Sequence, residues 1–565
     1  MATTSSPSSV VVVMVPYLSQ SHLNQLLQLA HHISSYHIPV DYVSSTLHTS
    51  QVNKAKWEML TFSINVNEAL RSNPTVTYLT LGSKLFWFAY YSAMAATSYL
   101  KDSSPSSVVV VMVPYLSQSH LNQLLQLAHL ISSYHIPVHY VSSTLHTSQV
   151  KSRSLNPLQQ LTKIHFHDFP LIPTLPSSRP NPGAGSGGTL LPCEATKFIR
   201  EPVAALLRSL SSNIKRLVVV HDVLMTSIVN CVVSLPNVEA YSISCASVFS
   251  FFTNTFAAMG RNDIIPIKNY PPLGSCYSSV FLEFIKTEMQ EMKSQAGHLY
   301  NTCRAIEGTF LDHLVNGLIN VNQGDKKKNK KTWAVGPLHQ MTISKKFRDE
   351  DKWLLEWLDR QEQNSVLYIS FGTTTSFSEE QIEEITVGLE QSGVKFIWVL
   401  KDGDKIHSFD NEKQVKRTEL PNGFEERMRE KGIGMVVREW VSQVEILGHK
   451  ATGGFMSHCG WNSCMESISM EVPVVAWPMN YDQPLNALLL TEVLKVGLAV
   501  LEWKQSGELV TSSMISTSVK TLMFSEEGGD IRKRIGELGA EVRNSVAEGG
   551  VTRMEWDSFI AHITR

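Results

Sequence analysis

The stretch "FMSHCGWNSCMES", residues 455–467, places a histidine, two cysteines, a tryptophan, an asparagine and a glutamate around one glycine. With the residues beside it, "GGFMSH" has the apolar pattern of a buried strand, and "CGWNS" is a tight turn. "NSCMESISM" then begins a helix, for which Asn462 and Ser463 are good N-terminal caps. A strand, a tight turn and a helix in this order are the repeating unit of an α/β fold.

Three kinds of chemistry could use these residue types. A tetrahedral metal site needs further ligands, and Cys459, Cys464 and His458 have no second Cys or His pair nearby. The motifs "HFHD" (165–168) and "DGD" (402–404) also carry metal-ligand residue types, but each stands alone. A cysteine nucleophile lacks an orienting Asn or Asp that the sequence can place beside it. Ordinary buried thiols are therefore the preferred interpretation.

A phosphate cradle fits the same stretch better. The first N–H groups of a helix are unpaired and lie at the positive end of its dipole, so they attract an anion. His458 stands at the mouth of the strand, and Glu466, one turn into the helix, can accept hydrogen bonds from sugar hydroxyls. The alternative from this stretch alone is an ordinary capped helix with a packed Trp461.

Strands and helices alternate on both sides of a lysine-rich segment, "DKKKNKK", which is polar and aperiodic and is expected to be a linker. We expect an N-terminal domain at 103–322, a linker at 323–335 and a C-terminal domain at 336–565. In the latter, "SEEQIEEITVGLEQSG" should be a helix opened by Ser378 and closed near Gly393. The sequence therefore predicts two doubly wound α/β domains with a ligand in the cleft between them.

Residues 5–52 recur at 103–150, and only His32/Leu130 and Asp41/His139 differ between the copies. Each copy has the pattern of a strand, a loop, a helix and a second strand. Only one copy can occupy the first position of one sheet, and the second runs directly into the remaining chain. We assign 103–150 to the fold and treat 1–102 as an appendage of uncertain order.

Composition narrows the class of protein. The chain has 565 residues, 43% of them hydrophobic, and a formal net charge of −2, which gives no electrostatic case for nucleic acid or an anionic membrane as partner. Seven cysteines without regular spacing fit a reducing compartment. The apolar N-terminal run is too short for a signal peptide, and residues 85–100 are too few to cross a bilayer. A cytoplasmic monomer is expected.

Residues 440–483, "WVSQVEILGHKATGGFMSHCGWNSCMESISMEVPVVAWPMNYDQ", resemble the signature box of plant family 1 UDP-glycosyltransferases nearly position for position. Glu471 is one departure, because the family usually has Gly before Val-Pro. The resemblance implies the GT-B fold, in which two Rossmann-like domains face each other and the C-terminal one holds the nucleotide sugar. The last helix of that domain could pack back on the N-terminal one.

The resemblance also implies roles for individual residues in donor binding. Trp440 stacks on uracil, Gln443 and Glu466 take the ribose hydroxyls, and Asp482 and Gln483 take the hexose hydroxyls. Four further residues hold the diphosphate: Thr373, His458, Asn462 and Ser463. Trp461, which lies between His458 and Asn462 in the sequence, also belongs to the donor-binding residues.

The acceptor hydroxyl needs a general base, because its pKa lies far above 7. The family has a histidine in the loop after the first strand, and "PYLSQSHLNQ" puts His120 there, with Ser119 where the family usually has Gly. By the same resemblance Asp222, 102 residues later in "LVVVHDVL", orients the imidazole. His22 is the duplicate of His120, but the spacing to Asp222 favours His120.

Within the family the chain is most similar to the zeatin O-glucosyltransferase group, over about 106–565. This resemblance implies inverting transfer of glucose or xylose from UDP to a side-chain hydroxyl of a cytokinin, with UDP-glucose or UDP-xylose as co-substrate and no cofactor or metal. A flavonoid or terpenoid alcohol is an alternative acceptor. A different class of alternative is an inactive nucleotide-sugar-binding protein, because the first copy could displace the second. A dehydrogenase is disfavoured, since "GAGSGG" (183–188) follows no strand.

Overall fold

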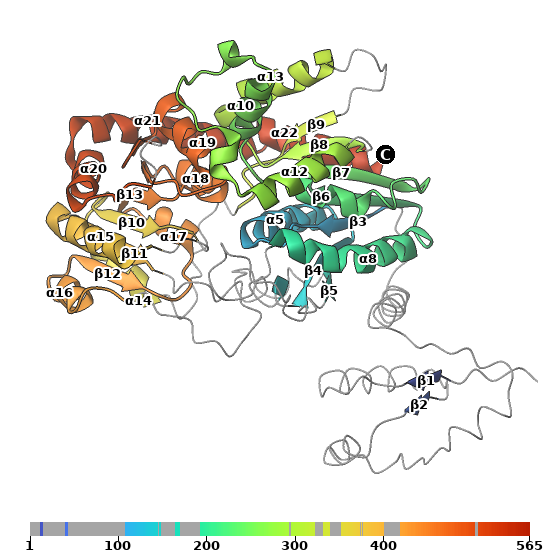
Figure 1. Cartoon of the computed structure of the whole chain (residues 1–565), viewed down its shortest axis with the longest axis horizontal. Coiled ribbons are helices and arrows are strands. Elements are labelled where there is room, and N and C mark those ends of the chain that lie inside the picture. Colours follow the sequence, from blue (N-terminus) through green and yellow to red (C-terminus); the bar gives the residue numbers. More distant parts are fainter. Residues whose placement is uncertain are drawn as a thin grey trace, which may run out of the picture. The chain divides into compact units, whose positions relative to one another are not determined.

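The computed structural model divides into two compact units, Met1–Met94 and Ala95–Arg565, which are described separately (Figure 1). The structure describes residues 12–14, 40–42, 108–144, 146–147, 164–169, 192–292, 295–321, 331–339, 352–372, 375, 377–400, 419–502 and 507–565. In the first unit, strands β1 (Val12–Met14) and β2 (Val40–Tyr42) pair in parallel. Some residues singled out above lie outside the described ones: His22, Thr373, the apolar segment 85–100, and the motifs at 183–188 and 402–404.

The second unit contains a seven-stranded sheet of order β5-β4-β3-β6-β7-β8-β9, in which every neighbouring pair is parallel. Its strands are β3 (Val108–Val113), β4 (Val138–Ser143), β5 (Ile164–Phe169), β6 (Arg216–Asp222), β7 (Val238–Ser244), β8 (Gly297–Tyr300) and β9 (Lys331–Ala334). The second copy of the duplicated segment thus supplies β3 and β4. Strand β9 lies within the expected linker 323–335, so that expectation was wrong for residues 331–334.

The helices of this half follow the strands along the chain, and the first three of them pack against the sheet. They are α5 (Gln118–Ser133), α8 (Pro192–Ser211), α9 (Thr226–Val229), α10 (Val248–Ala258), α11 (Leu273–Cys276), α12 (Ser279–Glu291) and α13 (Arg304–Val321), with 3-10 turns η1 (Val223–Met225) and η2 (Asn262–Ile264). All six residues of β3 are buried, as expected of a central parallel strand covered on both faces. The apolar stripe of α5 is buried as well: Leu121, Leu124, Leu125 and Ala128.

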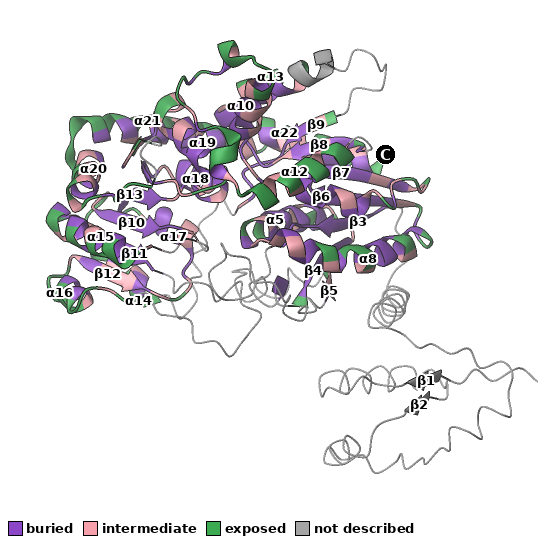
Figure 2. Cartoon of the chain, in the orientation of Figure 1, coloured by how far each residue is buried: buried purple, intermediate pink, exposed green. Residues whose placement is uncertain are grey.

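A six-stranded parallel sheet of order β12-β11-β10-β13-β14-β15 forms the other half. Its strands are β10 (Val366–Ser370), β11 (Lys395–Val399), β12 (Gly434–Val437), β13 (Thr452–Ser457), β14 (Val474–Ala476) and β15 (Gly497–Ala499). The helices are α14 (Lys352–Asp359), α15 (Glu379–Ser392), α16 (Phe424–Glu430), α17 (Gln443–Leu447), α18 (Trp461–Ser469), α19 (Gln483–Leu488), the π-helix η5 (Leu489–Val493), α20 (Ser512–Phe524), α21 (Glu526–Val546) and α22 (Val551–Thr564). In Figure 2 the strands of both sheets are largely buried and the exposed residues lie mainly on outer helices.

Helix α15 confirms its predicted boundaries. Ser378 accepts a hydrogen bond from the N–H of Gln381, and Gly393 ends the helix at φ 65°. Glu471, at the family's usual glycine position, also has a left-handed backbone, with φ 61°. Glu471 therefore carries a side chain at a backbone position that favours glycine.

The last helix, α22, packs on the seven-stranded sheet although it follows the six-stranded one in sequence. Phe559, Ile560 and Ile563 belong to the same buried core as the residues of β3 and β6. At the sheet edge the Trp556 indole donates to the carbonyl of Val335 at 2.8 Å. The C-terminal segment thereby ties the two sheets together. Among the described residues, no helix combines the length and the apolarity that crossing a membrane requires.

Candidate active site

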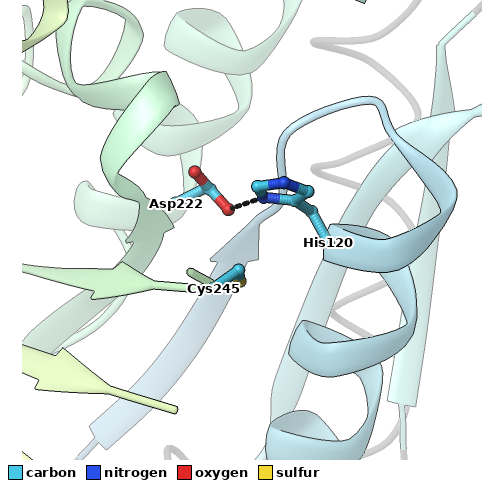
Figure 3. Close-up of side chains that lie close together, drawn as sticks. All are labelled: His120, Asp222 and Cys245. Carbon is cyan, nitrogen blue, oxygen red and sulfur yellow. Dashed lines mark hydrogen bonds and ion pairs between the residues drawn. The ribbon is translucent and has the colours of Figure 1, made fainter. Parts of the chain in front are cut away.

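His120 and Asp222 meet at the carboxyl edge of the seven-stranded sheet (Figure 3). His120 lies in the first turn of α5, directly after β3, and Asp222 is the last residue of the neighbouring strand β6. The ring Nδ1 is 2.6 Å from Asp222 Oδ2, and Oδ1 accepts from the N–H of Leu224 at 2.9 Å. Both carboxylate oxygens are engaged, so the orientation of Asp222 is fixed. With Nδ1 bound, Nε2 is the nitrogen of His120 that can accept a proton.

The surroundings of His120 favour its charged form. Burial lowers the pKa of His120, but the charge of Asp222, the hydrogen bond to it and the more distant charge of Asp482 outweigh burial and raise the pKa above its ordinary value. Asp222 is fully buried, whereas the side chain of His120 is 22% exposed. The arrangement suits a general base that a carboxylate orients and whose imidazolium it stabilises.

A cluster of aromatic rings reaches the base through Tyr115. The ring of Tyr115 lies edge-on to His120, with centroids 5.2 Å apart, and within 6.5 Å of the rings of Phe281 and Phe284 on α12. Tyr481, from the other half, lies 5.6 Å from Phe281. These rings form a wall that suits a flat apolar group beside the base.

The first turn of α18 lies close to the first turn of α5. The side-chain amide of Asn462 donates to the carbonyl of Ser119 at 3.1 Å, and its oxygen accepts from Gln123. The predicted caps were wrong, because the N-cap of α18 is Gly460. A Cβ at Gly460 or at Gly372 would lie 2.6 Å from His458 Nε2, so the His458 ring fills the space that a capping side chain would need.

The residues proposed to bind ribose do lie together. Gln443, at the start of α17, donates to Ser463 Oγ at 3.0 Å and to Glu466 Oε2 at 2.6 Å. Burial raises the pKa of Glu466 to about 7, although the hydrogen bond from Gln443 opposes it. Trp440, just before this group, is half-buried.

The side chains of Asp482 and Gln483, which were expected to bind the hexose, have different hydrogen-bond partners. Asp482 accepts from Asn486 at 3.0 Å, burial raises its pKa, and it is close enough to His120 for each charge to shift the pKa of the other. The Gln483 amide oxygen instead accepts from the N–H groups of Met479 and Asn480 at 2.9 and 3.1 Å. The side chain of Gln483 therefore stabilises the turn that precedes α19.

Trp461 is buried, and its indole donates to the carbonyl of Asn301 at 2.7 Å. Its side chain thus packs at the junction of the two halves, while its backbone belongs to the first turn of α18. Asn301 also donates to Gln123 at 2.6 Å. The sequence reasoning missed this bridge and Gln123 in particular. A signal existed, because Gln123 follows His120 by three residues and so shares its helix face.

Metal-ligand residue types gather beside the base. One ligand atom each of His120, Asp222 and Cys245 lies within 4.8 Å of the others, and no second group of three is found in the described ranges. His165 and His167 of the "HFHD" motif lie on the edge strand β5, where His167 is 2.7 Å from His139. All seven cysteines lie in the described residues and are free thiols.

Two parallel α/β sheets, one carrying a His–Asp pair and the other a helix start beside it, define a glycosyltransferase of the GT-B fold. Residues 343–526 match the family model described as UDP-glucoronosyl and UDP-glucosyl transferase. Residues 8–61 and 106–340 match the model described as glycosyltransferase, N-terminal domain. The chain belongs to the UDP-glucoronosyl and UDP-glucosyl transferase family, and it is a UDP-sugar-dependent O-glycosyltransferase.

The match to each of the similar proteins below covers nearly the whole length of that protein. It is 45% identical to the zeatin O-glucosyltransferase of Phaseolus lunatus, covering 81% of this chain and 98% of that protein. It is also 45% identical to the zeatin O-xylosyltransferase of Phaseolus vulgaris, covering 81% and 99%. The crystal structure of Medicago truncatula UGT71G1 complexed with UDP-glucose is similar, with a TM-score of 0.64 at 26% identity, over 81% of this chain and 99% of that one.

Proposed function

We propose that this chain transfers glucose, or xylose, from UDP to the side-chain hydroxyl of a zeatin-type cytokinin, with inversion at the anomeric carbon. The observation that carries the proposal is the 2.6 Å pair of His120 and Asp222, on which the charge of Asp482 from the other half also acts. A base from one half and a hexose-binding carboxylate from the other are what direct displacement on a sugar requires.

The proposed reaction begins when Nε2 of His120 takes the proton of the acceptor hydroxyl. The freed oxygen bonds to the anomeric carbon on the face opposite the diphosphate, and the bond between that carbon and the phosphate oxygen breaks. UDP leaves with the bonding electron pair. Asp222 stabilises the imidazolium, as the charge and hydrogen bond that raise the pKa of His120 imply.

We propose that the first turn of α18 receives the diphosphate. Its N–H groups and dipole stabilise the charge that develops on the leaving group, and His458 flanks them between Gly372 and Gly460. Gln443 and Glu466 take the ribose hydroxyls, Trp440 stacks on uracil, and Asp482 takes a hexose hydroxyl. Asn462 would exchange its contacts with Ser119 and Gln123 for a phosphate oxygen. The roles of Thr373 at the diphosphate and of Gln483 at the hexose are proposed from the family resemblance alone.

The acceptor class is supported by two independent observations. The names of the similar Phaseolus proteins are zeatin O-glucosyltransferase and zeatin O-xylosyltransferase. Tyr115 packs edge-on against His120, and the rings of Phe281 and Tyr481 follow it in turn; together they offer faces and edges to a planar purine. Both Phaseolus proteins are equally similar, so the sugar is proposed as either glucose or xylose.

Turnover assays test the proposal directly. The protein is incubated with UDP-glucose or UDP-xylose and a panel of trans-zeatin, cis-zeatin, a flavonol and a terpenoid alcohol. We expect O-glycosylated zeatin from the wild type and none from His120→Ala, while both proteins bind UDP. Product from the flavonol alone would overturn the cytokinin acceptor, and full turnover by His120→Ala would overturn the base.

A further inference from the structure

Three possible metal ligands meet at one edge of the seven-stranded sheet, and the transfer reaction proposed above uses only two of them. Cys245 directly follows β7, the neighbour of β6, so its thiol reaches the same carboxyl edge as Asp222 (Figure 3). One ring nitrogen of His120, one oxygen of Asp222 and the Cys245 sulfur all lie within 4.8 Å of one another. We propose that these three side chains form an inhibitory site for a thiophilic divalent cation such as Zn²⁺.

The spacing suits such an ion. Zn²⁺ binds His nitrogen, Asp oxygen and Cys sulfur at about 2.0–2.3 Å. Two ligands of a tetrahedral ion with such bonds lie about 3.3–3.7 Å apart. The 2.6 Å contact between His120 Nδ1 and Asp222 Oδ2 would widen by roughly 1 Å, and the proton that the ion displaces from Nδ1 would move to Nε2 of the same ring.

The ligand set also selects the ion. Mg²⁺ and Ca²⁺ take oxygen ligands, whereas an imidazole, a carboxylate and a thiolate together are typical of Zn²⁺. Cys245 is buried, and burial with the nearby Asp222 raises the pKa of its thiol. Binding therefore breaks the S–H bond and releases that proton to solvent.

Occupation of this site would stop transfer, because the ion takes the orienting carboxylate and an imidazole nitrogen from the proposed base. This consequence rests on the proposed function, but binding of the ion does not. Direct binding and turnover are therefore measured separately.

Calorimetric titration of the full chain with Zn²⁺ tests binding, with Mg²⁺ as the comparison ion. Cys245→Ser keeps a hydrogen-bond donor of similar size and removes the sulfur ligand. We expect it to weaken Zn²⁺ binding by at least about tenfold while zeatin glycosylation without metal continues. Cys231→Ser, at an exposed cysteine, is the matched control and should bind Zn²⁺ as the wild type does. His167→Asn controls for the histidines around β5.

Co²⁺ absorption of the wild-type protein gives a second readout that needs no variant, because a thiolate ligand adds a sulfur-to-metal charge-transfer band. The proposal predicts this band, Zn²⁺ inhibition that a chelator reverses, and resistance of Cys245→Ser to that inhibition. Equal Zn²⁺ affinity of wild type and Cys245→Ser, or binding lost only in His167→Asn, would overturn the site. Zn²⁺ binding that Cys245→Ser abolishes without any effect on turnover would keep the site and contradict the role of His120 as base.

Discussion

At the scale of single residues, the chemistry of the site depends on opposing influences on a few titratable groups. Burial alone would lower the pKa of His120, and the charge of Asp222 with the hydrogen bond to it outweighs burial. Glu466 has a hydrogen bond from Gln443 but no opposing charge that outweighs burial, so its pKa lies near 7. Glu466 therefore titrates near neutral pH, where its protonation can affect donor binding.

The raised pKa of His120 sets the pH dependence of transfer. A general base must be uncharged, so activity is lost as pH falls through the pKa of His120. We expect kcat/KM to rise with pH with an apparent pKa above about 6.5, the ordinary value for histidine. Asp222→Asn removes the charge, so the limb should move to lower pH while the plateau falls by up to about 10⁴-fold. If the acidic limb of the kcat/KM profile stays at the same pH in Asp222→Asn, the charge of Asp222 does not set the pKa of His120.

Donor affinity should depend on the ionisation of Glu466. Its carboxylate can accept hydrogen bonds from two ribose hydroxyls, and its protonated form accepts fewer. Because its pKa is about 7, UDP should bind more weakly at pH 6 than at pH 8. Glu466→Gln should bind UDP weakly at both pH values in calorimetry. If UDP binding by Glu466→Gln depends on pH as it does in the wild type, a group other than Glu466 causes the pH dependence.

At the scale of elements, helix boundaries were predicted where only local contacts decide them. Ser378 and Gly393 end α15 as the sequence indicates, because a hydroxyl cap and a left-handed glycine are local devices. At α18 a tertiary contact decides instead. The His458 ring leaves no room for a side chain at position 460, and Asn462 bonds to α5, which is far away in sequence. Such long-range pairing has no signature in a local pattern.

Glu471 provides a test of backbone conformation at the end of α18. Its left-handed φ of 61° costs an ordinary residue about 1 kcal/mol relative to glycine. Its side chain forms an ion pair with Arg543 on α21. Glu471→Gly and Glu471→Ala both lose that pair, and only the glycine variant relieves the backbone. We expect Glu471→Gly to be more stable than Glu471→Ala by about 1 kcal/mol in urea unfolding; equal stabilities would contradict this explanation.

At the scale of the whole molecule, the alternation of strands and helices was enough to predict two doubly wound α/β domains, and the resemblance to plant family 1 UDP-glycosyltransferases was needed to predict the GT-B fold. Strand β9 was missed because its four residues adjoin a lysine run, and it is defined by pairing with β8 rather than by its own pattern. The pair of His120 and Asp222 could be predicted from resemblance. Cys245 and the aromatic wall could not, since their residues meet only in the tertiary fold. Gln123 shares the helix face of His120, but its partners Asn301 and Asn462 lie far away in sequence.

The duplicated segment gives a prediction for the whole chain. The seven-stranded sheet takes its β3 and β4 from the second copy, and Ala95–Arg565 forms one compact unit. Protein lacking residues 1–102 should therefore glycosylate zeatin at least as fast as the full chain and should unfold at the same temperature. If the full chain is inactive and the truncated protein active, the first copy blocks the site. If both bind UDP and neither transfers sugar, the chain is a binding protein.

The crystal structure of a complex with UDP-glucose tests the central claim most directly. We expect the diphosphate at the first turn of α18, the ribose beside Glu466, and the anomeric carbon near Asp482 with its open face toward Nε2 of His120. A nucleotide sugar bound away from α18, or an anomeric carbon whose open face points away from His120, would contradict that claim.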